Sequence, residues 1–221
     1  MHLTGFLAIV ASLAQAGTED EPARAAIQKL AGRFKDARTI SARIVQIRRT
    51  ELLDKPITSS GMMYYRRDPV RLVFQLTDPR KAEIHMDRTS YQVYRPDEKR
   101  LERIDFENND ITSRLLMMFE PKTDEIGKVF TIQKGELRDG RMDVHLEPTD
   151  EKARRHLKKL TLTLVEADGM LDRIVCTDGE GDEVRFDLSD VKLNPPLSSD
   201  LFQLKVPEGT RLLRHALKRE K

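Results

Sequence analysis

Apolar residues recur along this chain with two different spacings, which divide it into a helical opening and a long β region. After Asp20, Glu21 and Pro22, apolar side chains fall three or four positions apart up to Phe34, which predicts an amphipathic helix. Beyond it the spacing becomes two, and short runs are separated by Gly, Asp, Asn and Pro turns. The runs predict about eleven strands, near 38–53, 61–67, 70–77, 82–88, 91–95, 99–106, 128–134, 141–147, 157–166, 170–177 and 182–192.

The alternation places many large apolar side chains on one face of the predicted sheet. From Val70 to Leu76 every second residue is apolar, and these side chains project to the same side. Strands and helices do not alternate, so an antiparallel sheet is predicted, with glycine-containing hairpin turns at 138–140, 167–169 and 178–181. A wide sheet with one apolar face must close on itself, meet a second sheet or be covered by helices. Because few helices are predicted, we expect a cavity lined by apolar side chains.

Two segments depart from the β pattern. Residues 110–119 begin with a capping Asp110 or Thr112 and carry five bulky apolar residues in succession at 115–119, which predicts a short helix that is apolar nearly all round. The tail, 210–221, predicts a weak basic helix or a frayed end.

The N-terminus has the composition of an export signal. Residues 1–16 contain no Lys, Arg, Asp or Glu, and their apolar run of about 12 residues is shorter than the roughly 20 needed to span a bilayer. The run ends in Ala14-Gln15-Ala16, which predicts a signal peptide cleaved after Ala16. The rest of the protein is therefore expected to work outside the cytoplasm. An uncleaved anchor is the alternative, because only His2 and the terminal amine supply positive charge.

Composition favours one domain at 17–210 followed by a basic tail at 211–221. The single cysteine, Cys176, allows no internal disulfide, so the core must be large enough to hold the fold alone. The 39 basic residues are interleaved with 37 acidic ones, for a net charge of +2. A nucleic-acid interface is not expected, since it needs a clustered basic face.

The sequence contains no recognisable set of catalytic or metal-binding residues. The five histidines are far apart in the chain, and the acidic run 178–183 lacks the alternate-position ligands of a calcium loop. Cys176 lies in an apolar strand, which favours a buried structural role over a nucleophilic one. We therefore expect no enzyme activity, no metal and no cofactor, and a hydrolase is disfavoured for want of a nucleophile and a base.

Several short motifs occur in order along the β region. Residues 60–69 read Ser-Gly-Met-Met-Tyr-Tyr-Arg-Arg-Asp-Pro, and the turn Leu76-Thr77-Asp78-Pro79 follows. Further on come the apolar helix at 112–119, Leu146-Glu147-Pro148, and Phe-Gln-Leu-Lys-Val-Pro-Glu-Gly-Thr at 202–210. This ordered set resembles the periplasmic outer-membrane lipoprotein carrier proteins, the LolA family, over about 40–210.

The resemblance implies a mainly β fold of the LolA/LolB type. It is an unclosed antiparallel half-barrel of about eleven strands, with a helical lid over a hydrophobic cavity. The cavity would take the acyl chains of a lipoprotein released by an inner-membrane ABC transporter and deliver them to an outer-membrane acceptor. The expected protein is a monomeric periplasmic carrier that makes transient contacts with membrane proteins.

The resemblance also implies which residues serve the cavity and the lid. The arginine that fastens the lid in the family aligns with Arg67, but Asp68 interrupts the family's Arg-Pro order and leaves Arg66 as the alternative. The expected cavity and lid residues are Arg67, Met63, Tyr65, Leu72, Phe74, Leu76, Ile84, Met86, Leu115, Leu116, Met118 and Phe119. A second function remains open: a domain of the same fold that senses a lipid or lipoprotein, or acts as a scaffold, in envelope regulation.

Overall fold

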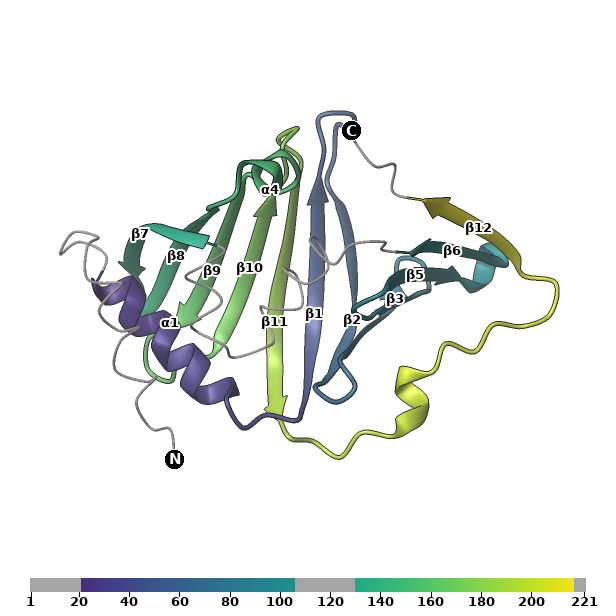
Figure 1. Cartoon of the computed structure of the whole chain (residues 1–221), viewed down its shortest axis with the longest axis horizontal. Coiled ribbons are helices and arrows are strands. Elements are labelled where there is room, and N and C mark those ends of the chain that lie inside the picture. The colour runs from purple at the N-terminus through teal and green to yellow at the C-terminus, as the bar shows by residue number, and fades with distance from the viewer. Residues whose placement is uncertain (1–20, 106–129, 217–221) are drawn as a thin grey trace, which may run out of the picture.

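The computed structural model describes residues 21–105 and 130–216, which form one twelve-stranded sheet with short helices around it (Figure 1). The predicted signal peptide and the predicted helix at 110–119 lie outside the described residues. The elements are α1 (Glu21–Phe34), β1 (Thr39–Arg49), β2 (Ile57–Arg66), β3 (Arg71–Asp78), β4 (Ala82–Met86), β5 (Ser90–Arg95), η3 (Pro96–Glu98), β6 (Arg100–Asp105), β7 (Phe130–Arg138), β8 (Arg141–Pro148), α4 (Glu151–His156), β9 (Lys159–Val165), β10 (Leu171–Thr177), β11 (Glu183–Leu193), η4 (Ser199–Phe202) and β12 (Arg211–Ala216).

The strand order is β12-β6-β5-β4-β3-β2-β1-β11-β10-β9-β8-β7. Two runs of antiparallel neighbours, β1 to β6 and β7 to β11, are joined where β11 pairs with β1. Within the described residues, β7 and β12 are the two edges, so the sheet does not close. Figure 1 shows the strands turning from upright in β8–β11 to nearly horizontal in β5, β6 and β12, which is the accumulated twist of a wide sheet. The predicted mainly β, unclosed antiparallel architecture is confirmed, with twelve strands where about eleven were expected.

The predicted hairpin turns are present between neighbouring strands. Asp139 (φ 48°) and Gly140 (φ 70°) connect β7 to β8, and two successive positive φ angles are typical of a tight two-residue turn. Gly169 (φ 71°) lies between β9 and β10, and Gly181 (φ 96°) lies between β10 and β11. The glycine-containing turns thus connect β7 to β8, β9 to β10 and β10 to β11, whereas α4 lies between β8 and β9.

Helix α1 packs against one end of the sheet, over β7 and β8. Its predicted apolar stripe is its buried side, made of Ala23, Ile27, Leu30 and Phe34. Gly135 on β7 permits the close approach, because a Cβ at this position would lie 2.7 Å from the Cβ of Ala23. Burial of each large apolar side chain contributes roughly 1.5–3 kcal/mol, so packing holds the helix in place. We call the sheet face that α1 covers the inner face and the opposite one the outer face.

Part of the outer face is buried as well, which the alternating pattern does not predict. After β11 the chain returns beneath the sheet, and η4 contacts β3. Phe202 of η4 is buried, and the guanidinium carbon of Arg66 lies 4.5 Å from the centroid of its ring. Val73 projects to the outer face and is 0% exposed. The expectation of a single apolar face is therefore wrong for β3.

The predicted helix or frayed end of the tail is also wrong over 211–216. Arg211–Ala216 forms β12, which pairs with β6 in parallel while every other pair in the sheet is antiparallel. The hydrogen bond from the Arg211 amide to the Lys99 carbonyl, 2.8 Å long, marks where this pairing begins. The short helix α4 was not predicted either. The pairing of β12 was not predicted because parallel neighbours are joined by a long connection, which has no local turn sequence to identify it.

Candidate functional site: the inner face of the sheet

Seven of the predicted cavity residues lie together on the inner face of β2, β3 and β4. The strand register places six of them in two rows across β2, β3 and β4, which are Met63–Phe74–Ile84 and Tyr65–Leu72–Met86. The seventh, Leu76 on β3, lies opposite Gly61 on β2. All of them except Ile84 belong to or border the apolar cluster that also contains the buried side of α1. The remaining predicted residues of this set, Leu115, Leu116, Met118 and Phe119, lie outside the described residues.

Burial on the inner face falls into two classes. Met63, Tyr65, Leu72 and Met86 are 0–7% exposed and act as packed core. Other apolar side chains on this face are only half-buried. They include Phe74, Leu76, Ile84, Ile132, Cys176 and Phe186. These half-buried side chains still expose apolar area, which burial against an apolar partner would stabilise.

Phe74 and Phe186 are the aromatic centre of this surface. Their rings stack with centroids 5.8 Å apart and an interplanar angle of 25°. Phe186 was not among the predicted site residues, although its position in the alternating run 182–192 is a signal that could have identified it. Two aromatic side chains from β3 and β11 thus meet above the intervening β2 and β1.

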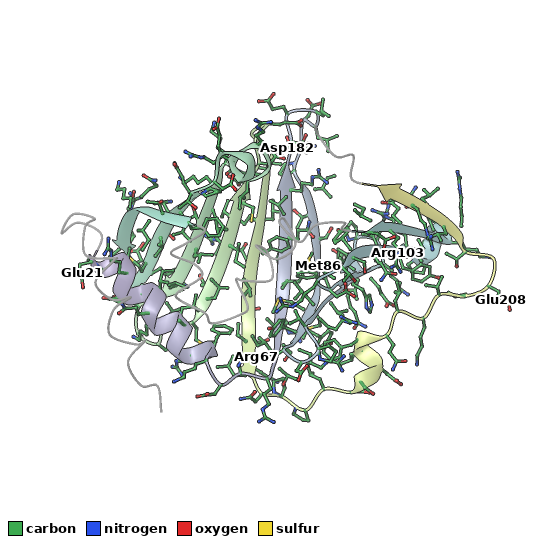
Figure 2. All side chains as sticks on the ribbon, in the orientation of Figure 1. Glu21, Arg67, Met86, Arg103, Asp182 and Glu208 are labelled. Atoms are coloured by element: carbon green, nitrogen blue, oxygen red, sulfur yellow. The ribbon has the colours of Figure 1, made fainter. Side chains whose placement is uncertain are left out.

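Arg67 follows β2 and reaches the C-terminal end of α1, as Figure 2 shows at the lower end of the sheet. Its Nη1 donates to the Lys35 carbonyl (2.7 Å) and its Nη2 to the Phe34 carbonyl (2.6 Å). The Phe34 carbonyl, which also accepts from the Ala37 amide, ends α1, and Lys35 follows it; a cation is favourable at this negatively polarised end of a helix. Arg66 instead stacks on Phe202 at the outer face. Of the two arginines left open by the sequence, Arg67 is the one that contacts α1.

Comparison with known proteins agrees with this geometry. Residues 35–205 match the family model for the outer membrane lipoprotein carrier protein LolA. The chain belongs to the LolA family. The matched range begins just after α1 and ends beyond η4, so it includes Arg67 and most strands of the inner face. The chain is therefore a member of a lipid- or lipoprotein-binding family.

Solved structures resemble the chain at low sequence identity. An uncharacterized conserved protein from Thermus thermophilus is 10% identical, with a TM-score of 0.51 over 87% of this chain and 99% of that one. A LolA superfamily protein of Nitrosomonas europaea is 13% identical (TM-score 0.43; 82% and 97% covered). The lipoprotein LppX of Mycobacterium tuberculosis is 16% identical (TM-score 0.45; 81% and 98% covered). None of the curated proteins matches the chain.

A polar pocket of about 430 Å³ adjoins Arg67 in this LolA-family chain. It is lined by Arg67, Asp68, Pro69, Val70, Arg71, Asp87, Arg88 and Thr89. Burial alone would raise the pKa of Asp87, but hydrogen bonds from Thr89 and Ser90 and the charge of Arg71 outweigh it, so the pKa lies below its ordinary value. Arg71 Nη1 is 3.3 Å from this carboxylate. Asp87 is therefore a charged anchor for the β4–β5 turn.

Chemically reactive groups are sparse on the inner face. Burial raises the pKa of the Cys176 thiol to about 11, which keeps it protonated and unreactive at neutral pH. Among residues 21–105 and 130–216, no group of three or more His, Cys, Asp and Glu side chains is placed to hold a metal ion. In the same part of the chain, no helix has both the length and the apolar character to cross a membrane.

Proposed function

We propose that this chain is a periplasmic carrier that binds the acyl chains of lipoproteins on its inner face and shuttles them from the inner to the outer membrane. Its signal peptide would be removed after Ala16, an inner-membrane ABC transporter would load it, and an outer-membrane acceptor would unload it. The observation that carries the proposal is the half-buried apolar surface around Phe74 and Phe186, in a chain of the LolA family.

The energetics of transfer suit this surface. Moving an acyl chain of about 16 carbons out of water gains roughly 0.8 kcal/mol per CH₂, on the order of 10 kcal/mol before entropy costs. A carrier must also release its guest, so an incompletely packed surface is more useful than a tightly packed core. Met63 and Met86 belong to the packed core beside this surface, where methionine, a flexible side chain, can adapt when a guest displaces its neighbours.

The hydrogen bonds of Arg67 hold the C-terminal end of α1 in place, and they are weak enough to break. Two hydrogen bonds from a guanidinium to main-chain carbonyls contribute about 1.5–3 kcal/mol each when well shielded and less at a half-exposed site. An energy of this size is smaller than the gain from burying an acyl chain. Binding of a guest can therefore displace the end of α1 without unfolding the sheet.

The decisive experiment measures acyl-chain uptake. Delipidated protein is incubated with membranes that carry a triacylated lipoprotein, and the soluble complex is quantified. Phe74→Glu places a carboxylate on the inner face and should abolish uptake. Val45→Glu is the matched control, since Val45 projects to the outer face of β1 and is 37% exposed. Equal uptake by wild type and Phe74→Glu would contradict the proposal.

Depleting the protein in cells distinguishes a transport function from a sensing function. Lipoproteins retained in the inner membrane support a carrier. Normal lipoprotein sorting with an altered envelope-stress response supports a sensory or scaffold domain of the same fold instead.

A further inference from the structure

Two uncharged polar side chains interrupt the apolar inner face beside the aromatic pair. The inward-facing residues of β1 up to Ile44 are apolar and 0–2% exposed, and the next inward-facing residue is Gln46. The register partner of Gln46 on β2 is Ser59, and its partner on β11 is Phe186. Directly opposite side chains in a sheet have Cβ atoms about 4.5–5.5 Å apart. Gln46 therefore lies between a hydroxyl group and an aromatic ring.

The polar groups of this pair have unused hydrogen-bonding capacity. Gln46 and Ser59 are half-buried, and within residues 21–105 and 130–216 neither side chain forms a hydrogen bond. A glutamine amide offers two donors and an acceptor, and a serine hydroxyl offers one donor and also accepts. Covering such groups with pure hydrocarbon costs free energy, because they lose water and gain no partner. A guest that lies over them is favoured when it brings a polar group to this point.

The inner face of β1 changes in three steps toward the β1–β2 turn, at the upper end of this strand in Figure 1. It is buried and apolar through Ile44, half-buried and polar at Gln46, and exposed at Arg48. The partner of Arg48 on β2, Ile57, is 48% exposed. An acylated molecule has the same order of groups: a hydrocarbon chain, an uncharged carbonyl linkage and a solvated remainder. The match gives the guest an orientation, with its solvated part toward the turn.

We infer that Gln46 and Ser59 bind the ester or amide carbonyl that joins an acyl chain to the rest of its molecule, while the hydrocarbon contacts Phe186 and Phe74. The inference rests on the proposed function and adds to it the position and the orientation of the guest. The Gln46 amide and the Ser59 hydroxyl can each donate to a carbonyl oxygen, and the Gln46 oxygen can accept from an amide linkage. Neutral hydrogen bonds have a modest net strength, so they add selectivity without preventing release.

The test compares three uncharged ligands on the delipidated full chain. They are the monododecanoyl ester of glycerol, the corresponding amide of aminopropanediol, and the dodecyl ether of glycerol, in which a methylene replaces the carbonyl. The ether is the most apolar of the three, so a surface that recognises only hydrocarbon would bind it at least as tightly as the others. Calorimetry below the micelle concentrations should instead show about three- to tenfold tighter binding of the ester or the amide. Whichever of these two binds more tightly identifies the preferred linkage.

Variants locate the preference on the protein. Gln46→Leu should bring the ratio of carbonyl-ligand to ether affinity to one or below without weakening the ether. Ser59→Ala should lower this ratio by a smaller factor, and Ser59→Thr, which keeps the hydroxyl, should retain it. Gln75→Leu is the matched control, because Gln75 is also half-buried but lies on the outer face of β3, in register with Met62 and Glu83. Chemical denaturation checks that each variant is folded.

The outcomes separate this inference from the carrier proposal. Wild-type protein that binds the ether as tightly as the ester and the amide would overturn the inference and leave the carrier proposal standing. The same holds for a preference that survives both Gln46→Leu and Ser59→Ala. Failure of the wild type to bind any of the three ligands would overturn both.

Discussion

Phe74 of β3 and Phe186 of β11 stack with ring centroids 5.8 Å apart, although β2 and β1 lie between their strands. Three interstrand spacings in a flat sheet amount to about 14 Å, so the contact requires the sheet to curve inward at this point. Gly61 on β2 contributes, since it adds no side chain to the inner face between the two rings. The aromatic pair is therefore a direct measure of the curvature that creates a concave apolar surface.

The stacked pair predicts a measurable coupling between distant strands. Phe74→Leu and Phe186→Leu each remove one ring while keeping an apolar side chain. A double-mutant cycle on the free energy of unfolding should give a coupling of about 0.5–1.5 kcal/mol, because stacked rings add this much beyond the area they bury. A cycle between Phe186→Leu and Ile57→Ala, at the exposed end of β2, should give none. Coupling energies that are the same in both cycles would contradict the stacked geometry.

Gly61 should tolerate no side chain. A Cβ at this position would overlap the carbonyl oxygen of Gln75 on β3, where the β2–β3 register also shifts. Gly61→Ala must therefore move backbone, and we expect it to lower the free energy of unfolding by more than about 2 kcal/mol. Gly32→Ala is the matched control: this glycine is exposed in α1 with open space around it, so alanine should stabilise by up to about 1 kcal/mol. Chemical denaturation measures both, and two changes of the same sign would contradict the placement of Gly61.

Local patterns predicted the elements whose cause is local. Helix α1 has an apolar stripe at helical spacing, and Asp139-Gly140 has the turn chemistry of its hairpin, so both could be read from neighbouring residues. Strand β12 could not, because its partner β6 is about a hundred residues away and pairs in parallel. The burial of the outer face of β3 was not predicted for the same reason, because η4, which carries Phe202, packs against β3 only after a long connection.

The candidate site was predictable only as a set of inward-facing positions. Alternation identified Leu72, Phe74 and Leu76, and the structure places them on the inner face. Which of them pack tightly and which stay half-buried depends on the curvature of the whole sheet, and no run of residues encodes it. The polar pair Gln46 and Ser59 was not among the predicted site residues, because polar residues of β1 and β2 look like ordinary solvated strand positions in the sequence.

Arg67 should stabilise the end of α1, whereas Arg66 should not. Arg67→Gln removes two charge-assisted hydrogen bonds to the Phe34 and Lys35 carbonyls, and we expect a loss of about 1–2 kcal/mol of unfolding free energy at this half-exposed site. Hydrogen exchange should become faster at the Ala37 amide, which donates to the Phe34 carbonyl. Arg66→Gln should lose only the cation–π contact with Phe202, about 0.5–1 kcal/mol, and leave exchange at Ala37 unchanged. Faster exchange at Ala37 in the Arg66 variant alone would reverse the assignment.

His85 lies on the outer face of β4, 6% exposed, in register with Val73 and Gln92. Burial lowers its pKa, and this effect exceeds the opposing influence of Glu83, whose carboxylate is 3.5 Å from Nε2. The folded protein therefore binds a proton at His85 less readily than the unfolded chain, whose histidine has a pKa of about 6.5. Protonation favours unfolding, so this contribution is fully present above about pH 7 and is lost as pH falls through 6.5 toward the folded pKa.

Replacing His85 should remove that part of the pH dependence. We expect the unfolding free energy of the wild type to fall between about pH 7 and pH 5 more steeply than that of His85→Gln, with parallel curves above pH 7. The pKa of His145 is also lowered, chiefly by burial, but His145 is present in both proteins and its contribution cancels in the difference. Urea denaturation at each pH gives the two curves, and NMR titration of the His85 ring gives the folded pKa directly. Parallel curves over the whole range, or a His85 pKa at or above about 6.5, would show that the imidazole is not held neutral by burial.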